Sequence, residues 1–356
     1  MKRNGFGLLA LLVGLCAACA GPAQPVARLT ATPSETPTQT RTALYPTAKA
    51  RATAAAPPTP TVQAPEASIT FTPISVLPSL TPTPFQSTPA TVKNEVLDVW
   101  DDPAHEKDYW SRQTQLITGE RVRVLEEQGD WARIVVPGQP SHKDPRGYPG
   151  WVRRSGLAPG WADAEQYAVV MVGVSFAREK PQVDSDLAQR LALDARLPVS
   201  QLAAGWVEVA LPDGRTGWIR RSDVRLSADP DQAVALDGFY LTAQSLVGIP
   251  YLWGGTETRA LDCAGFIYRL FHAYGISLPR DADDQAVAGQ PVSLDQLRRG
   301  DLVFSSDVKG GAVTHVVMVW GSGQVIDANS PAGLTIHSLG DVTRTGYLVG
   351  ARRYLP

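Results

Sequence analysis

One cysteine in this chain stands where a thiol can act as a nucleophile. Cys263 is the only cysteine after position 19, and it follows a glycine-bounded loop that begins at Tyr251. Apolar residues continue from it at helical spacing, at 267, 270, 271 and 274. Free backbone N–H groups and the dipole at a helix N-terminus favour the thiolate over the thiol. The pattern indicates a reactive cysteine, and the alternative is a buried, inert thiol.

A cysteine nucleophile needs a base, and three histidines follow it in the sequence. His272 lies on the same helix, two and a half turns along and roughly on its opposite side, so we expect a structural role for it. His337 falls in a late strand, away from the start of the sheet. His315 opens an apolar strand directly after a flexible glycine pair. We therefore predict that His315 is the general base.

A third group must orient that base, and Asp327 is the candidate. The strand of His315 is followed by Gly321-Ser322-Gly323, which is typical of a tight hairpin, and then by a second strand. Across this hairpin Asp327 can accept from the ring N–H of His315 and stabilise the imidazolium. The alternative for Asp327 is a carboxylate that caps the strand end.

The elements expected around these residues form an α+β domain over 231–356. Periodicity predicts a helix over 231–248 that ends before Pro250, then the cysteine helix, then a short helix over 281–288. Alternating and apolar runs predict strands at 300–304, 313–320, 324–328, 334–339 and 347–354. Helices followed by an antiparallel sheet indicate the α+β class.

The preceding region contains an internal repeat. Segments 131–137 and 150–155 share a pattern of alternating strand, turn and Gly-Trp-aliphatic strand with segments 206–212 and 217–222. The turn between the tryptophans is longer in the first copy, over 138–149, and only the last two strands of the second copy are clear. Most of the tryptophans are expected to be core residues.

The N-terminal region has the composition of an export signal and a tether. Residues 1–19 have a basic start and a short apolar run, and they resemble a bacterial signal peptide with a lipobox whose lipidated cysteine is Cys19. The alternative is an ordinary signal peptide cut after Ala18 or Ala20. Residues 20–92 are rich in Pro, Thr, Ala and Ser, so we expect a disordered linker.

The C-terminal motifs resemble those of the NlpC-type cysteine peptidases, papain-like enzymes of the bacterial cell wall. The motifs agree in order and spacing, and they are Tyr251-x-Trp253-Gly254-Gly255, Asp262-Cys263-x-Gly265-Phe266, Leu278-Pro279-Arg280-Asp281, Gly300-Asp301-Leu302-Val303-Phe304, His315-Val316 and the hairpin before Asp327. The resemblance implies a Cys–His pair with a third polar residue that is usually His and here is Asp327. It also implies that the Tyr251 hydroxyl joins the Cys263 N–H in the oxyanion hole. The alternative for Tyr251 is packing on Trp253.

The repeat resembles the bacterial SH3-like domain, once over 93–160 and less completely over 161–228. Together the resemblances imply an α+β papain-like catalytic domain preceded by two small SH3-like β-barrels. The implied reaction is hydrolysis of the γ-D-glutamyl–diamino acid bond of peptidoglycan stem peptides, with a preference for a free N-terminal L-Ala. Asp262 would bind that amino group or would merely cap the helix, and Tyr148 would reach the cleft from the first module or would only pack within it. Ala264 and Ala282 depart from the serines usual in the family.

Composition and cysteine usage limit the other possibilities. The formal net charge of −2 gives no reason to expect a nucleic-acid partner. The histidines and cysteines lack metal-ligand spacing, and we expect neither a metal nor a cofactor. We expect a monomeric, extracytoplasmic protein that is either lipid-anchored to the membrane or secreted. The competing functions are a papain-like amidase or acyltransferase on another substrate, and a non-catalytic peptidoglycan-binding lipoprotein.

Overall fold

The structure is a computed structural model that describes residues 87–356, and these residues belong to one compact unit. The predicted signal peptide, the proposed lipidation at Cys19 and nearly all of the predicted linker lie outside the described residues. The linker was predicted to reach residue 92, and this boundary is wrong. Strand β1 (Thr88–Val92) pairs with two strands of the first sheet and buries Ala90 and Val92. The alternation that buries every second residue was hidden by the adjoining Pro/Thr-rich sequence.

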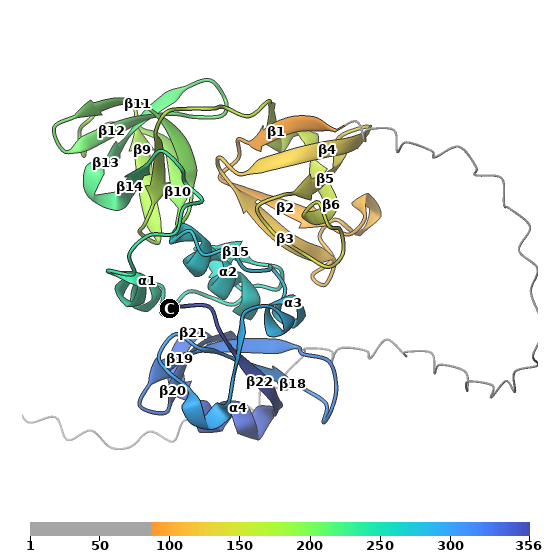
Figure 1. Ribbon diagram of the computed structural model, residues 1–356. Coiled ribbons are helices and arrows are strands. Elements are labelled where there is room, and N and C mark those ends of the chain that lie inside the picture. The colour runs from red at the N-terminus through yellow and green to blue at the C-terminus, as the bar shows by residue number, and fades with distance from the viewer. Residues whose placement is uncertain (1–86) are drawn as a thin grey trace, which may run out of the picture. The chain divides into compact units, whose positions relative to one another are not determined.

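The first sheet is antiparallel and has seven strands in the order β3-β2-β6-β5-β4-β1-β7 (Figure 1). The remaining strands are β2 (Val96–Trp100), β3 (Arg112–Ile117), β4 (Arg121–Gln128), β5 (Trp131–Val136), β6 (Tyr148–Arg153) and β7 (Leu157–Pro159). Short 3₁₀ turns lie at Pro103–His105 and Arg154–Gly156. The long turn predicted over 138–149 is the connection between β5 and β6.

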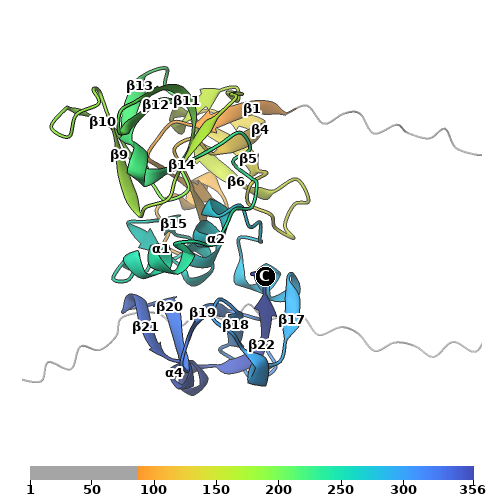
Figure 2. The same ribbon diagram turned by 60° about the vertical axis from the view of Figure 1, so that its left-hand side comes forward.

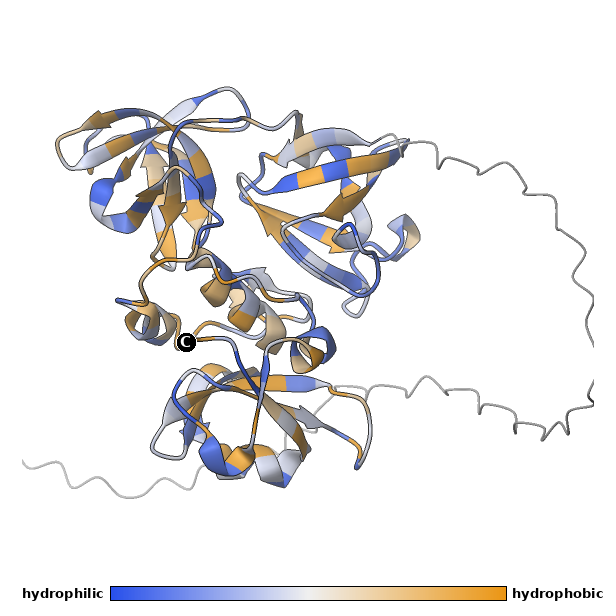
Figure 3. Ribbon diagram, viewed as in Figure 1, coloured by the Kyte–Doolittle hydropathy of each residue, from blue (hydrophilic) through white to orange (hydrophobic). Residues whose placement is uncertain are grey.

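The second sheet repeats the first strand for strand, in the order β10-β9-β13-β12-β11-β8-β14. Its strands are β8 (Tyr167–Val170), β9 (Val174–Arg178), β10 (Leu187–Ala192), β11 (Arg196–Ala203), β12 (Trp206–Ala210), β13 (Thr216–Arg220) and β14 (Val224–Ser227). A 3₁₀ turn at Arg221–Asp223 precedes the last strand. Figure 3 shows hydrophobic and hydrophilic residues alternating along strands of these sheets. The internal repeat is therefore confirmed, and its assignment to SH3-like domains stays a prediction.

The C-terminal part contains a six-stranded antiparallel sheet in the order β17-β22-β18-β19-β20-β21. Its strands are β17 (Gln290–Val292), β18 (Leu302–Ser306), β19 (His315–Gly321), β20 (Gln324–Asn329), β21 (Gly333–Ser338) and β22 (Tyr347–Arg353). The helices are α1 (Phe239–Ser245), α2 (Cys263–Ala273), α3 (Ala282–Val287) and α4 (Leu339–Thr345). A small hairpin of β15 (Thr256–Glu257) and β16 (Ala260–Leu261) precedes α2, and a 3₁₀ turn lies at Leu294–Gln296.

Both faces of this sheet are apolar, because helices cover both. Leu302 and Phe304 pack with α2, whereas Val303 between them packs with Val342 of α4. Figure 1 and Figure 2 show α2 and α4 on opposite sides of the sheet. The sheet therefore gives α2, and Cys263 at its first turn, a rigid support.

The helix predicted over 231–248 is wrong at its first half. Only Phe239–Ser245 is α-helical, and Gly238 at its N-cap has a φ of +84° that stops the helix from extending backward. The Val234 N–H instead donates to the Tyr274 carbonyl oxygen at the end of α2, at 3.1 Å. The apolar residues before 238 thus pack as an irregular segment. In the part of the chain that the structure describes, no helix has the length and apolarity to cross a membrane.

Candidate active site

Cys263 is the first residue of α2, as predicted, and its helix start is held by backbone contacts that only glycine permits. A Cβ on Gly265 would lie 2.0 Å from the Gly255 carbonyl oxygen. The same oxygen accepts from the Asp262 N–H at 3.0 Å. The two glycines of the loop and helix motifs therefore bring the loop against the first turn of α2. The thiol of Cys263 is buried, with 7% of the residue exposed.

His315 and Asp327 meet across the hairpin in the predicted way. Met318 pairs with Ile326, so the register brings Asp327 to the end of the hairpin where His315 begins β19. His315 Nε2 lies 2.8 Å from Asp327 Oδ1, and Oδ1 makes no hydrogen bond to any other described residue. Cys263 is close enough to His315 for its charge to act on the ring. Because Nε2 faces the carboxylate, Nδ1 is the nitrogen that remains for the sulfur.

The electrostatics of this group favour an imidazolium. Burial by itself would lower the pKa of His315, but the negative sulfur of Cys263 and the bond to Asp327 outweigh burial and raise this pKa well above its ordinary value. Burial would raise the pKa of Asp327, whereas hydrogen bonds from His315, Asn329 and His337 lower it. The carboxylate therefore stays ionised and stabilises the positive ring.

Tyr251 lies close to the sulfur. Burial, followed by the negative charges of Cys263 and Asp262, raises the pKa of the Tyr251 phenol far above its ordinary value. The hydroxyl therefore keeps its proton at neutral pH and can donate a hydrogen bond. A bridge between Tyr251 and Leu261 fixes its backbone beside the residues that lead into α2.

Asp262 caps α2, which was one of its two predicted roles. Its Oδ1 accepts from the Gly265 N–H at 2.6 Å and its Oδ2 accepts from Arg280 Nη2 at 2.6 Å. Burial raises the pKa of Asp262, although Arg280 and the Gly265 N–H act in the opposite direction. Both carboxylate oxygens are thus already engaged, and the cap holds the helix start in place.

Tyr148 both packs in the first sheet and reaches the C-terminal part. It is the first residue of β6 and is 1% exposed. Its hydroxyl donates to Asp281, with oxygen–oxygen distances of 2.9 and 3.2 Å to the two carboxylate oxygens. Burial, followed by the charge of Asp281, raises the pKa of this phenol well above its ordinary value. The long β5–β6 connection therefore lies against the segment 280–284.

Comparison with known proteins shows the family to which the chain belongs. The NlpC/P60 family matches residues 248–353. The chain is 37% identical over 215 residues to a protein of Bacillus subtilis named gamma-D-glutamyl-L-lysine dipeptidyl-peptidase, with 60% of this chain and 71% of that protein covered. The chain belongs to the NlpC/P60 family. A protein of the same name from Bacillus cereus is 32% identical over 254 residues, covering 68% of this chain and 75% of that protein.

Solved structures that resemble this chain include a member of the same family. The crystal structure of an NlpC/P60 family protein from Bacillus cereus superposes with a TM-score of 0.68 at 26% identity, covering 76% of this chain and 100% of that chain. A shorter match is the peptidoglycan endopeptidase RipB of Mycobacterium tuberculosis, 34% identical over 104 residues, or 26% of this chain and 42% of that protein. This NlpC/P60 chain is an enzyme, a cysteine peptidase with the papain-like catalytic fold.

Sequence reasoning missed two groups near the NlpC/P60 site. His337 Nε2 lies 3.0 Å from Asp327 Oδ2, and Asn329 Nδ2 donates to the same oxygen at 2.7 Å. The signal was present, because Asp327 pairs with Thr335 and residue 337, two positions on, shares its face. The second group, Lys143 on Asp281, joins residues 138 positions apart in sequence, and no local pattern indicates it.

One of the two departures from the family pattern lies in α2 and the other at the start of α3. Ala264 is 3% exposed, and its carbonyl oxygen accepts from Gln285 Nε2 at 3.2 Å. Ala282 is the first residue of α3, directly after Asp281. Neither alanine supplies the hydroxyl that a serine would offer to a substrate.

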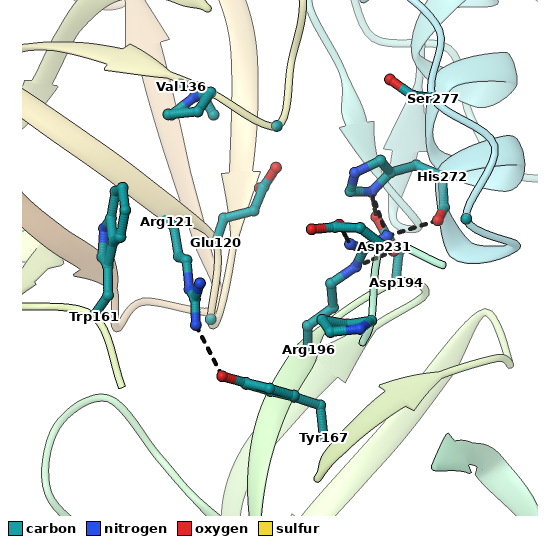
Figure 4. Close-up of a pocket in the computed structure, with 15 residues that line it drawn as sticks. Glu120, Arg121, Val136, Trp161, Tyr167, Asp194, Arg196, Asp231, His272 and Ser277 are labelled. Carbon is teal, nitrogen blue, oxygen red and sulfur yellow. Dashed lines mark hydrogen bonds and ion pairs between the residues drawn. The ribbon is translucent and has the colours of Figure 1, made fainter. Parts of the chain in front are cut away.

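A cavity of about 410 Å³ lies at the other end of α2 from Cys263 (Figure 4). His272 lines it and has the structural role we expected, with its Nδ1 2.5 Å from Asp194 Oδ2. Figure 4 shows Arg196 between Asp194, Asp231 and His272, and Arg121 donating to Tyr167 at 2.9 Å. These charged and polar groups already pair with one another, so the cavity is a polar junction distinct from the group of Cys263, His315 and Asp327.

One group of side chains offers metal-ligand atoms within 4.8 Å of one another, His142 with Asp283 and Asp284. His142 Nδ1 already shares a hydrogen bond of 2.8 Å with Asp284 Oδ1, and the His142 N–H donates to Asp284 Oδ2 at 3.0 Å. These bonds anchor the β5–β6 connection to α3. The group does not include Cys263 or His315, and we assign it a structural role.

Proposed function

We propose that this chain is a cell-wall cysteine endopeptidase that hydrolyses the γ-D-glutamyl–diamino acid bond of peptidoglycan stem peptides. The observation that carries the proposal is the Cys263 thiol at the start of α2, close to His315, whose Nε2 lies 2.8 Å from Asp327 Oδ1. The Bacillus relatives are named gamma-D-glutamyl-L-lysine dipeptidyl-peptidases, which supports the bond type.

In the acylation step, the Cys263 thiolate attacks the carbonyl carbon of the γ-glutamyl amide and a C–S bond forms. The oxyanion is stabilised by the Cys263 backbone N–H and the Tyr251 hydroxyl. The first N–H groups of a helix have no partner within it, which leaves the Cys263 N–H available. The C–N bond then breaks as the His315 imidazolium transfers its Nδ1 proton to the leaving nitrogen. The products are a thioester and the free amine of the diamino acid.

In the deacylation step, His315 Nδ1 takes a proton from water, and the resulting hydroxide attacks the thioester. The C–S bond breaks, the carboxylic acid leaves, and the thiolate–imidazolium pair is restored. Asp327 holds the ring through Nε2 in both steps and stabilises its positive charge. The Cys263–His315–Asp327 triad therefore uses a carboxylate where the family usually has a second histidine.

We further propose that the enzyme favours peptides with a free N-terminal L-Ala. Two anionic groups near the start of α2 support this preference, namely Asp262, which caps the helix, and Asp281, which accepts from the Tyr148 hydroxyl and lies 3.6 Å from the Arg280 that bonds Asp262. A protonated α-amino group is the substrate feature that such carboxylates recognise. Tyr148 reaches from the first sheet, so that sheet contributes to the amine end of the proposed substrate site.

We also propose an extracytoplasmic location, with the chain secreted or anchored through a lipid on Cys19. The name of the Mycobacterium tuberculosis relative, a peptidoglycan endopeptidase, supports a location at the cell wall. The lipobox-like sequence at 16–21 supports the anchor.

The test is to incubate the purified protein with L-Ala-γ-D-Glu-diaminopimelate, with its N-acetylated form, and with intact sacculi, and to identify products by mass spectrometry. We expect cleavage of the free peptide between D-Glu and the diamino acid, and loss of at least about 10⁴-fold in kcat for Cys263→Ala. Absence of cleavage of all substrates, or equal cleavage by the Cys263→Ala variant, would contradict the proposed function.

A further inference from the structure

Lys143 places a positive charge on the amine end of the proposed substrate site. It belongs to the β5–β6 connection, and its Nζ lies 2.9 Å from Asp281 Oδ2. The same ammonium donates to the Tyr148 hydroxyl at 2.5 Å and to Gln113 Oε1 at 3.3 Å. It also lies 4.4 Å from the centroid of the Tyr148 ring. A carboxylate, two neutral acceptors and an aromatic face thus surround one ammonium, which has three N–H donors to offer.

The groups around Lys143 need a cation in this position. The Tyr148 hydroxyl donates its only proton to Asp281 or to the Gln113 carbonyl oxygen, so it can only accept toward Lys143. Tyr148 is buried, and 22% of the Asp281 side chain is exposed. Without a cation a partly buried carboxylate would lose its closest positive partner, which is costly. An ammonium from another molecule that replaces Lys143 would find the same set of acceptors.

This ammonium site is connected directly to the catalytic helix. Arg280 Nη1 lies 3.6 Å from Asp281 Oδ1, and Arg280 Nη2 donates to Asp262 Oδ2 at 2.6 Å. Both oxygens of Asp262 are engaged, by Arg280 and by the Gly265 N–H. Asp281 is therefore the carboxylate at this end of the site that can exchange its partner, and its present partner is a flexible lysine.

The structure lets the Lys143 side chain leave while its backbone stays. The neighbouring His142 is bonded to Asp284 through both its backbone N–H and its ring. The Pro140 carbonyl oxygen accepts from the Arg280 N–H at 3.1 Å. The loop is thus attached to residues on both sides of Asp281, namely Arg280 and Asp284. By contrast, 32% of the Lys143 side chain is exposed to solvent.

We propose that Lys143 is a resident competitor of the substrate, whose ammonium occupies the Asp281–Tyr148 site and is displaced by the free α-ammonium of an incoming peptide. The proposal rests on the proposed preference for free-amine peptides and adds the residue that sets its strength. Only a peptide with a positively charged N-terminus replaces the displaced ammonium, so Lys143 lowers the affinity for free-amine peptides, whereas the affinity for an N-acylated peptide does not depend on Lys143.

The test measures binding separately from catalysis. L-Ala-γ-D-Glu and its N-acetyl form are titrated calorimetrically into the full chain carrying Cys263→Ala, with and without Lys143→Met. Methionine keeps the length of the side chain and removes its charge. We expect Lys143→Met to tighten binding of the free-amine dipeptide about 5- to 10-fold. Lys180→Met, an exposed lysine of the second repeat, is the matched control and should leave the affinity unchanged.

The outcomes separate this inference from the proposed function. Unchanged or weaker binding of the free-amine dipeptide in the Lys143→Met variant overturns the competitor role, as does failure of the free-amine dipeptide to bind to either protein. A similar gain for both dipeptides also overturns it, because the effect would then not depend on the amine. In the cleaving enzyme, we expect Lys143→Met to lower KM for the free-amine peptide at unchanged kcat. If binding tightens and the enzyme cleaves no peptide, the competitor role stands and the proposed function fails.

Discussion

Replacing Asp327 with Asn tests whether this carboxylate orients the His315 ring and raises its pKa. The carboxylate accepts on both sides, from His315 at Oδ1 and from Asn329 and His337 at Oδ2. An amide has one oxygen, so an NH₂ group must face one of these sides. If it faces His315, the ring must accept at Nε2 and carry its proton on Nδ1, where it cannot take a proton from Cys263.

The magnitude follows from the contact that is lost. A hydrogen bond to a charged group contributes about 1.5–3 kcal/mol, and 1.36 kcal/mol corresponds to a tenfold change in rate. We therefore expect kcat/KM to fall roughly 10- to 160-fold if the amide oxygen still faces His315. The loss rises to about 10⁴-fold if the wrong tautomer dominates.

The direction in which the pH profile of kcat/KM shifts follows from the pKa of His315. Asp327 contributes to the raised pKa of His315, and the active thiolate–imidazolium pair is lost when the ring deprotonates at high pH. Without the negative charge this pKa falls, so the alkaline limb of kcat/KM should move to lower pH in the Asp327→Asn variant. A purely structural role for Asp327 would change the amplitude of the profile without moving this limb.

The assay is the pH dependence of peptide cleavage by wild type, Asp327→Asn and Asp341→Asn. Asp341 is the matched control, because it lies 3.8 Å from the other ring nitrogen of His337 and does not contact His315. Thermal melting checks that each variant is folded. Activity within twofold of wild type together with an unmoved alkaline limb in the Asp327→Asn variant would refute the triad.

Two further variants test the oxyanion hole and the buried core. Tyr251→Phe should lower kcat about 10²- to 10³-fold with little change in KM, because it removes one oxyanion donor. A change in KM at unchanged kcat would contradict this. Tyr347→Phe is the control, because Tyr347 is a half-exposed residue of β22. Arg269→Met should lower the free energy of unfolding by about 3–5 kcal/mol in urea titrations, because it removes a buried cation that Asp194 and Glu120 share. Arg269 is 1% exposed and donates to Asp194 at 3.0 Å and to Glu120 at 3.3 Å. The exposed Arg344→Met should change little, and an effect of equal size there would refute the reasoning.

The sequence predicted that His315 and Asp327 meet and that Cys263 begins a helix, because the determinants of these features are local. Helical spacing after Cys263 predicted α2, and the glycine turn at 321–323 predicted the hairpin that joins His315 to Asp327. The repeated Trp pattern predicted two copies of one unit, and both sheets have the same strand order. In each case the signal is a period of two or 3.6 residues or a turn residue, which acts over a few positions.

Predictions failed where distant contacts override local pattern. The apolar stripe before Phe239 has helical spacing, but Gly238 and a bond to the end of α2 keep residues 231–237 out of the helix. Strand β1 lies in sequence that reads as linker, and its pairing with β4 and β7 makes it a strand. Composition alone cannot reveal these partners, because they are supplied by other segments.

The sequence by itself predicted a candidate nucleophile at a helix start, a histidine to serve it, and the strands that bring that histidine to Asp327. Only the tertiary structure decided what surrounds them. It put Lys143 of the β5–β6 connection and Tyr148 of β6 on Asp281, and it gave Arg269 of α2 carboxylate partners in both repeats. These contacts join residues separated by 75 to 149 positions. Chain folding sets such contacts through the packing of whole sheets, and no short-range periodicity encodes them.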